Sequence, residues 1–244
     1  MTTNNIDRTV LVTGVGRRAG IAAAIGEALR SDGWRVLTTG WRGYDARMPW
    51  GADAEPLADF DVDLTDPNVP NELLATIKAQ YGPLQALVLC HCESVDSSIL
   101  DTTVASFDRH YQVNVRASWL LIKAFAEQFE AGPNAAGSGR IVAITSDHTP
   151  FNLPYGATKG ALDRLVLAAS VELADRGITA NVVNPGGTDN GWMDDDVRTA
   201  TLDRNITKRL GTSADAARLV RFLCSDEGAW INNQLLYSDG GQLR

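Results

Sequence analysis

Tyr155 and Lys159 stand four residues apart in the run YGATK, which opens a segment with helical periodicity. That spacing places two side chains on the same face of a helix. A free tyrosine has a pKa of about 10, and a neighbouring ammonium favours the phenolate. Such a phenol can exchange a proton with an alcohol or a carbonyl near neutral pH. Ser146 follows the apolar run GRIVAIT, where its hydroxyl can hydrogen-bond a substrate oxygen on which charge develops. The three residues predict chemistry at a carbonyl or alcohol.

A glycine-rich run, TGVGRRAGIA, lies between an apolar strand pattern and a helical pattern. Glycine at 14, 16 and 20 allows the backbone to approach a pyrophosphate, and a helix that begins near Gly20 directs free N–H groups toward it. In this context the run predicts a dinucleotide site. The alternative is an ordinary turn between a strand and a helix.

The second predicted strand ends at Thr39-Gly40-Trp41-Arg42, and no acid stands there. Folds that prefer NAD usually place a carboxylate at this point for the ribose hydroxyls. Arg17, Arg18 and Arg42 offer charge-assisted hydrogen bonds to a 2′-phosphate instead. These residues favour NADP(H) over NAD(H), although each arginine alone is also consistent with a solvated surface charge.

The elements that would position these residues alternate between β-rich and helical patterns. The expected strands share short apolar runs, at 9–14, 35–40, 84–92, 139–145, 178–184 and 234–241. The expected helices share a period of 3.6 residues, at 20–33, 71–82, 106–130, 155–177 and 213–226. This alternation predicts βαβ units around a parallel sheet with helices on both faces, a doubly wound α/β fold of the Rossmann type. A length of 244 residues fits a single domain over residues 1–244.

Three stretches look like loops, at 41–56, 131–139 and 186–205. The last one follows a strand at the edge where such sheets bind ligands, so we expect a mobile lid over the substrate. Trp192 and Met193 within it suggest an apolar contact with the substrate. The alternative is a solvated acidic loop around Asp194, Asp195 and Asp196.

Composition and charge narrow the class of partner. The net charge is −8, with 30 acidic and 22 basic residues and no basic cluster, which opposes binding to nucleic acid. No apolar run approaches the roughly 20 residues of a membrane helix. The start, MTTNNIDRTV, lacks a basic region followed by an apolar one, so we expect a cytoplasmic protein with a small-molecule substrate. Cys90, Cys92 and Cys224 do not have zinc-site spacing, and we interpret them as buried reduced thiols with no metal.

The ordered set of motifs resembles the short-chain dehydrogenase/reductase family along nearly the whole chain. It runs from TGVGRRAGIAAAIGEAL through VNVRASWLLIKAF, GRIVAITS, YGATKGAL and GITANVVNPGGTDNGWM to SDEGAWINNQLLYSDGG. The layout is most similar to 3-oxoacyl-[acyl-carrier-protein] reductases. The resemblance implies a carbonyl/alcohol oxidoreductase in which Tyr155 is the general acid/base and Ser146 orients the substrate oxygen. Lys159 would lower the pKa of Tyr155 and bind the nicotinamide ribose, and Asn114 would hold a water that links Lys159 to a proton relay.

The cofactor-binding residues are also expected by resemblance, with Asp63 near the adenine ring and Pro185, Gly186 and Thr188 at the nicotinamide end. The full set is Gly14, Gly16, Arg17, Arg18, Gly20, Ile21, Arg42, Asp63, Leu64, Cys90, His91, Asn114, Tyr155, Lys159, Pro185, Gly186 and Thr188. Relatives usually form tetramers through paired long helices and C-terminal strands, which implies a homotetramer or a homodimer.

Several positions depart from the family pattern. Gly20 follows Gly14 after five intervening residues, and Ala22 stands where the family has a third glycine. Leu89-Cys90-His91-Cys92 replaces Asn-Asn-Ala-Gly, and Asn232-Asn233 replaces Thr-Gly before the last strand. His91 either lines the nicotinamide-ribose region or is packed and hydrogen-bonded. The connection from Ser146 to Tyr155 is short, so that Thr145, Asp147 or His148 are possible substitutes for Ser146.

Two other functions compete with a reductase. One is non-redox chemistry on the same fold, as in halohydrin dehalogenases, which replace the helix lysine by arginine; Lys159 argues against it. The other is a cofactor-binding sensor with little turnover, motivated by Ala22 and the altered 89–92 segment.

Overall fold

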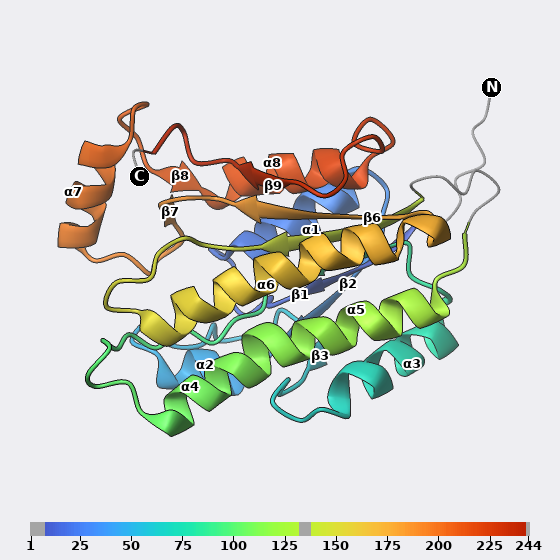
Figure 1. The fold of residues 1–244 in the computed structure, drawn as a ribbon, viewed down its shortest axis with the longest axis horizontal. Coiled ribbons are helices and arrows are strands. Elements are labelled where there is room, and N and C mark those ends of the chain that lie inside the picture. Colours follow the sequence, from blue (N-terminus) through green and yellow to red (C-terminus); the bar gives the residue numbers. More distant parts are fainter. Residues whose placement is uncertain (1–7, 132–137, 243–244) are drawn as a thin grey trace.

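A computed structural model describes residues 8–131 and 138–242, in which strands and helices alternate along the chain (Figure 1). Seven strands form one parallel sheet in the order β3-β2-β1-β4-β5-β6-β9. They are β1 (Thr9–Thr13), β2 (Arg35–Gly40), β3 (Phe60–Asp61), β4 (Ala86–Leu89), β5 (Gly139–Ile144), β6 (Ile178–Asn184) and β9 (Leu235–Tyr237). A separate pair joins β7 (Thr188–Asp189) to β8 (Gly211–Thr212). The expected doubly wound α/β fold is confirmed.

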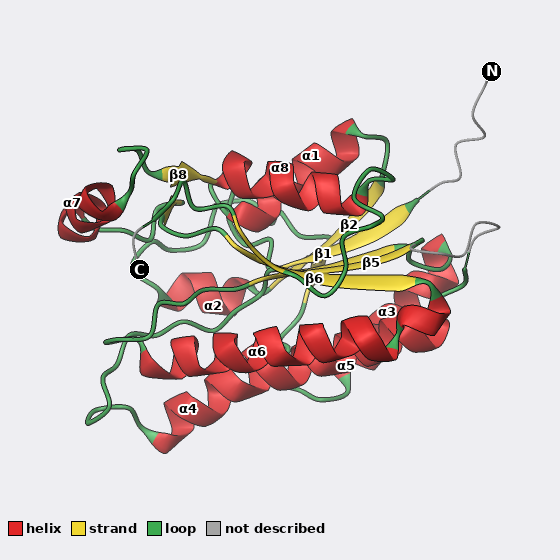
Figure 2. Ribbon diagram, turned by 45° about the horizontal axis from the view of Figure 1, so that its top comes forward, coloured by secondary structure: helices red, strands yellow, loops and turns green. Residues whose placement is uncertain are grey.

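Helices connect the strands in the described part of the chain. The α-helices are α1 (Ile21–Ser31), α2 (Arg42–Arg47), α3 (Val69–Tyr81), α4 (Val104–Tyr111), α5 (Ala117–Gln128), α6 (Leu153–Glu172), α7 (Asp195–Arg204) and α8 (Ser213–Cys224). Figure 2 shows α1 and α8 on one face of the sheet and α3, α5 and α6 on the other. No helix of the described residues is long and apolar enough to cross a membrane.

The strands are buried on both faces because their side chains alternate between two apolar clusters. In β1, Leu11 packs into the cluster beneath α3, α5 and α6, whereas Val10 and Val12 pack into the cluster with α1 and α8. β1 and β4 pair in parallel at the middle of the sheet. The strands that follow β1 in sequence extend to one side, as β2 and β3, and those that follow β4 extend to the other side, so the strand order reverses between β1 and β4. Ligands of such folds bind in the crevice beyond the carboxyl ends of the strands at this reversal.

The predicted helix over 106–130 is interrupted. A π-helical turn, Gln112–Arg116, separates α4 from α5, and Phe129 is already extended. Single π-helical turns inside α-helices often occur at functional sites. The turn carries Asn114, which is fully buried.

Two of the predicted loops contain regular structure. The 41–56 stretch begins with α2, and the 186–205 stretch contains β7 and α7. Asp194 caps α7 by accepting a hydrogen bond from the Val197 N–H, so part of the acidic run starts a helix and is not a solvated loop. Of the third stretch, 131–139, residues 132–137 lie outside the described part.

Candidate active site

Tyr155 and Lys159 lie in the first two turns of α6, and both line one cavity at the carboxyl edge of the sheet. Lys159 is only 2% exposed, and its Nζ donates a hydrogen bond of 2.8 Å to the Ile144 carbonyl. The same Nζ lies 5.6 Å from the centroid of the Tyr155 ring. An ammonium is therefore buried beside the phenol and is anchored to the end of β5.

Burial raises the pKa of the Tyr155 phenol above its usual value, and the nearby Cys92 thiol adds to the rise, whereas a hydrogen bond with Ser146 opposes it. In the protein alone, burial has the largest effect on this pKa. Desolvation penalises the phenolate more strongly than its neighbours stabilise it. The phenol is consequently held in its protonated form, which can donate a proton.

Ser146 comes directly after Thr145 at the end of β5, and its side chain lines the same cavity as Tyr155. The short connection to α6 folds tightly: the His148 N–H donates to Ser146 Oγ at 3.1 Å, and the Asn152 N–H donates to the Thr149 carbonyl at 3.1 Å. The shortened loop therefore keeps the Ser146 hydroxyl near Tyr155. Asp147 and His148 also line the cavity, but both are exposed.

Asn114 lies behind the cavity and does not line it. Its Oδ1 accepts a hydrogen bond of 2.7 Å from the Glu93 N–H, and its Nδ2 donates to the Glu93 carbonyl at 3.0 Å and to Thr158 Oγ1 at 2.8 Å. The amide thus joins the segment after β4 to α6, one residue before Lys159.

The glycine-rich run passes under the cavity between β1 and α1. Gly14 has a φ of 79°, and a Cβ there would lie 2.6 Å from the His91 nitrogen. A Cβ on Gly16 would lie 2.0 Å from Asp45 Oδ2. At Gly14 the positive φ and the backbone of His91 leave space for glycine alone, whereas a side chain at 16 would have to displace the Asp45 carboxylate. Gly20 precedes α1 without a side-chain cap, so the first N–H groups of the helix have no capping side chain. Ala22 packs in the core with a 3% exposed fraction.

The three arginines expected near the cofactor are not brought together. Arg17 lines the cavity and is mostly buried, with 11% of its side chain exposed. Arg18 and Arg42 are exposed and do not line it. The backbone N–H groups of both face carboxylates: that of Arg18 donates to Asp53 and that of Arg42 to Asp61.

The segment after β4 differs from the predicted strand, because β4 ends at Leu89. Cys90 and Cys92 are half-buried and line the cavity, and Cys224 is buried in the helix α8. The expectation of buried thiols therefore holds only for Cys224, and none of the three lies in a core strand. His91 is packed and hydrogen-bonded, one of the two expected alternatives. Its Nε2 faces the Val113 carbonyl at 3.1 Å and its Nδ1 lies 2.7 Å from Thr13 Oγ1. Because a carbonyl only accepts, Nε2 carries the proton and Nδ1 accepts from the hydroxyl.

The remaining expected cofactor residues meet around the same cavity, whose volume is about 960 Å³. Those that line it are Gly14, Gly16, Arg17, Gly20, Ile21, Asp63, Leu64, Cys90, His91, Tyr155, Lys159, Pro185, Gly186 and Thr188. A concave space that joins a glycine loop to a Tyr–Lys pair can hold a long ligand with phosphates at one end and a reacting group at the other.

The 186–205 segment covers the cavity and contacts the 41–56 segment. The indole of Trp192 stacks on that of Trp50, with ring centroids 5.1 Å apart and planes at 10°. Arg17 joins the two segments, because its guanidinium lies 5.0 Å from the Trp50 ring and donates to the Asn190 carbonyl at 3.1 Å.

Sequence reasoning missed two buried carboxylates that line the cavity. Glu93 is 2% exposed and pairs with Arg47 and with Arg109, whose Nε lies 3.2 Å from Glu93 Oε2. Asp45 is 6% exposed and lies against the glycine loop. The only available signal was a charged residue inside an unassigned stretch, which does not distinguish a buried carboxylate from a solvated one.

Comparisons with known proteins agree with this geometry. The model of the family described as enoyl-(acyl carrier protein) reductase matches residues 14–242. The uncharacterized oxidoreductase YjdA of Bacillus subtilis is 34% identical over 98% of both chains.

Two solved structures also match. A short-chain dehydrogenase from Burkholderia cenocepacia in complex with NADP is similar with a TM-score of 0.82, at 29% identity over 96% of this chain and 97% of that one. The angucycline C-6 ketoreductase LanV with bound NADP has a TM-score of 0.80, at 27% identity over 97% of this chain and 95% of that one.

Proposed function

Because the chain belongs to the short-chain dehydrogenase/reductase family and is an NAD(P)-dependent oxidoreductase of that family, we propose that it interconverts a carbonyl and a secondary alcohol. The proposed substrate is a ketone or a 3-oxoacyl compound, and Tyr155 is the general acid/base. The observation that carries the proposal is the convergence of Tyr155, Ser146 and Lys159 on the cavity that the glycine loop also lines.

The residues of the cavity fit a dinucleotide. Gly14 and Gly16 let the loop backbone pack closely against His91 and Asp45, and the uncapped start of α1 directs backbone N–H groups toward a phosphate. Asp63 and Leu64 would hold the adenine end, and Pro185, Gly186 and Thr188 the nicotinamide end. When bound, the reduced nicotinamide supplies the hydride.

The side chains of the protein would handle the proton and the substrate oxygen. In the direction of reduction, the Tyr155 hydroxyl donates its proton to the carbonyl oxygen, and the Ser146 hydroxyl hydrogen-bonds the same oxygen. The buried ammonium of Lys159 binds the nicotinamide ribose and favours negative charge that develops nearby. Asn114 links the segment after β4 to α6 beside Lys159, through its hydrogen bonds with Glu93 and Thr158. In this position it would support the relay that returns the proton to Tyr155.

For the cofactor itself we propose NADP(H) in preference to NAD(H). Support comes from the absence of an acid at the end of β2, from Arg17 beside the glycine loop and from NADP in two similar structures.

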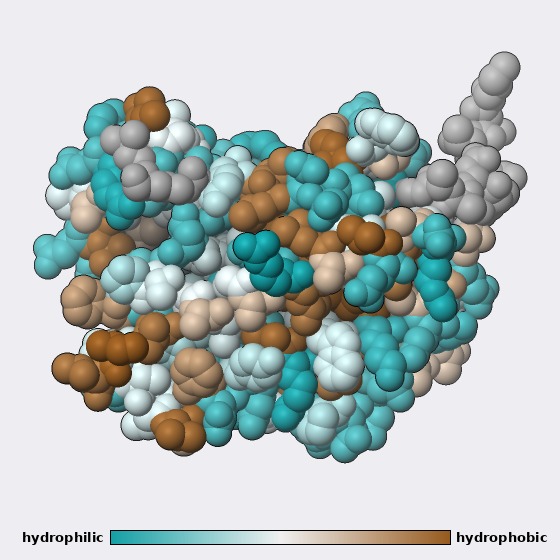
Figure 3. All heavy atoms as spheres, in the orientation of Figure 1, coloured by the Kyte–Doolittle hydropathy of each residue, from teal (hydrophilic) through white to brown (hydrophobic). Residues whose placement is uncertain are grey.

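For the assembly we propose a homotetramer. Figure 3 shows apolar side chains among polar ones over the face that α5 and α6 present, and Trp119 of α5 is 50% exposed and Val171 of α6 is 67% exposed there. A monomer in sedimentation would contradict this assembly.

The proposed function is tested with purified protein, NADPH and a panel of ketones and 3-oxoacyl thioesters, by following NADPH oxidation. Tyr155→Phe removes only the hydroxyl, so we expect turnover to fall about 10²- to 10⁴-fold while the Kd for NADPH stays within about twofold. Binding of NADPH without turnover of any carbonyl would indicate a sensor. Absence of dinucleotide binding would overturn the proposal.

A further inference from the structure

Asp45 is a buried carboxylate inside the cavity that the proposed mechanism does not use. It stands in α2, the short helix that follows β2, and its side chain turns back to the glycine loop. Trp50 Nε1 donates a hydrogen bond of 3.1 Å to its Oδ1, and Arg17 Nε lies 3.7 Å from the same oxygen. The carboxylate thus has one fixed position, held by an indole and a guanidinium.

The other oxygen of Asp45, Oδ2, lies at the glycine loop on the wall of the cavity. Oδ2 lies against Gly16, 2.0 Å from the position that a Cβ would take there, and Asp45 lines the cavity. Among the described residues, the hydrogen bond and the ion pair of Asp45 both involve Oδ1. Asp45 is 6% exposed, and a largely desolvated carboxylate gains free energy when a ligand hydroxyl supplies a hydrogen bond. Burial raises the pKa of Asp45, and the bond from Trp50 and the charge of Arg17 oppose that rise.

A phosphate would meet the opposite situation at this point. It brings negative charge and no hydrogen for Oδ2, and like charges this close disfavour each other. Of the arginines expected to hold a 2′-phosphate, only Arg17 lines the cavity. Its guanidinium is shared with Asp45, the Trp50 ring and the Asn190 carbonyl. The charge of Arg17 is therefore offset in part by Asp45 before any ligand arrives.

We propose that Asp45 is the residue that sets cofactor selectivity: its Oδ2 accepts a hydrogen bond from an adenosine-ribose hydroxyl of NAD(H), and its charge opposes the 2′-phosphate of NADP(H). The acid that the end of β2 lacks is supplied from α2, five residues beyond Gly40. The preference for NADP(H) is consequently small, and the protein binds both dinucleotides. This inference rests on the proposed dinucleotide function.

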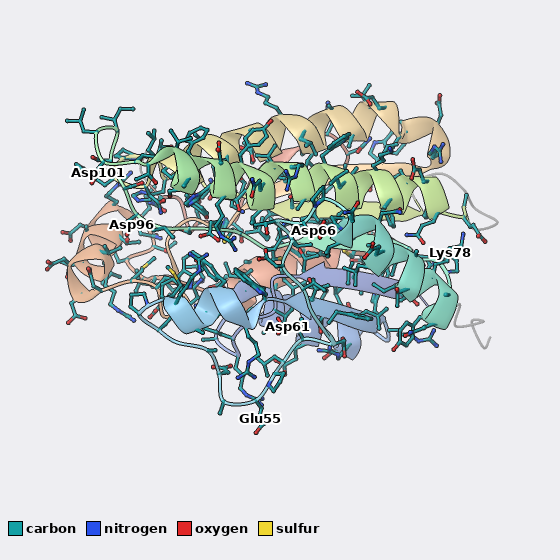
Figure 4. All side chains as sticks on the ribbon, turned by 90° about the horizontal axis from the view of Figure 1, so that it is seen from below. Glu55, Asp61, Asp66, Lys78, Asp96 and Asp101 are labelled. Carbon is teal, nitrogen blue, oxygen red and sulfur yellow. The ribbon has the colours of Figure 1, made fainter. Side chains whose placement is uncertain are left out.

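The test compares the Kd values of NAD⁺ and NADP⁺, measured by isothermal titration calorimetry, for the wild-type protein and for Asp45→Asn. The amide keeps the size of the side chain and its bond from Trp50 but removes the charge. We expect the ratio of Kd(NAD⁺) to Kd(NADP⁺) to rise at least fivefold. The matched control is Glu55→Gln, which removes one negative charge from the same 41–56 segment. Figure 4 shows Glu55 at the outer tip of that segment. We therefore expect Glu55→Gln to leave the ratio of Kd(NAD⁺) to Kd(NADP⁺) unchanged.

The outcomes separate the two proposals. A wild-type protein that binds neither dinucleotide contradicts the proposed function. If the protein binds dinucleotide but the Kd ratio rises less than fivefold in Asp45→Asn, the role of Asp45 is overturned. The same holds if the Kd ratio rises equally in Glu55→Gln. In both cases the proposed function still stands. Thermal unfolding checks that each variant is folded, and Asp45→Ser carries the same test if the amide variant unfolds.

Discussion

The ammonium of Lys159 donates to the Ile144 carbonyl at 2.8 Å, so the cation one helical turn from Tyr155 is tied to the end of the strand that precedes Ser146. This contact links α6, which carries Tyr155, to β5, the strand that leads to Ser146. The phenol of Tyr155 meanwhile keeps its proton, because burial raises its pKa.

The raised pKa of Tyr155 predicts opposite pH responses for the two directions of reaction. A phenol whose pKa lies above its usual value stays protonated as the pH rises, so the rate of carbonyl reduction should change less than about threefold between pH 6 and 9. Alcohol oxidation needs a proton acceptor and should accelerate up to about tenfold per pH unit. Initial rates at saturating substrate measure both. A reduction rate that falls by more than about threefold as the pH rises from 6 to 9 would contradict the assignment.

Replacement of Asn114 should destabilise the protein, because its amide satisfies the N–H and carbonyl of Glu93 inside the core. In Asn114→Ala these groups lose their partners, at a cost of about 1–3 kcal/mol each. Urea unfolding measures the loss. The exposed Asn68, changed to Ala, serves as the control and should cost less than about 0.5 kcal/mol. Equal losses in the two variants would show that the bonds of Asn114 contribute little.

His91 should make stability depend on pH. Burial lowers its pKa to about 3 from 6.5, so between these values the unfolded chain binds a proton that the folded protein does not. The free energy of unfolding should therefore fall as the pH drops from 6 to 4, by up to about 1.4 kcal/mol per pH unit from this group. His91→Asn lacks the titrating group. Urea unfolding at both pH values should give a smaller decrease for the variant, and an equal decrease would refute the role of His91.

The stack between Trp50 and Trp192 should hold the 186–205 segment against the 41–56 segment. Aromatic pairs contribute about 0.5–1.5 kcal/mol beyond the area they bury. We expect Trp192→Ala to weaken NADPH binding about threefold to tenfold and to increase proteolysis near Trp192. Trp192→Phe keeps a ring and should retain most of the affinity. Cleavage at the wild-type rate in Trp192→Ala would show that the stack does not restrain the segment.

Local patterns predicted most of the fold because they report on local physics. The short apolar runs of β1, β2, β5 and β6 follow from strands that are buried on both faces, and the spacing of Tyr155 and Lys159 follows from helix periodicity. The β3 strand has only two residues and α2 only six, too few for a periodic signal. The π-helical turn at Asn114 is also invisible to periodicity, since the residues on either side remain helical.

The sequence by itself determined the order of the elements, the glycine loop and the chemical type of the Tyr155 and Ser146 site. Only the tertiary structure decided the environment of each charged group. Lys159 is bound to Ile144, Arg17 is shared between Asp45 and Asn190, and Arg18 and Arg42 lie outside the cavity. The physical reason is that desolvation and pairing depend on which distant residues pack around a charge. For that reason the direction of the Tyr155 pKa and the presence of an acid beside Gly16 appear only in the folded protein.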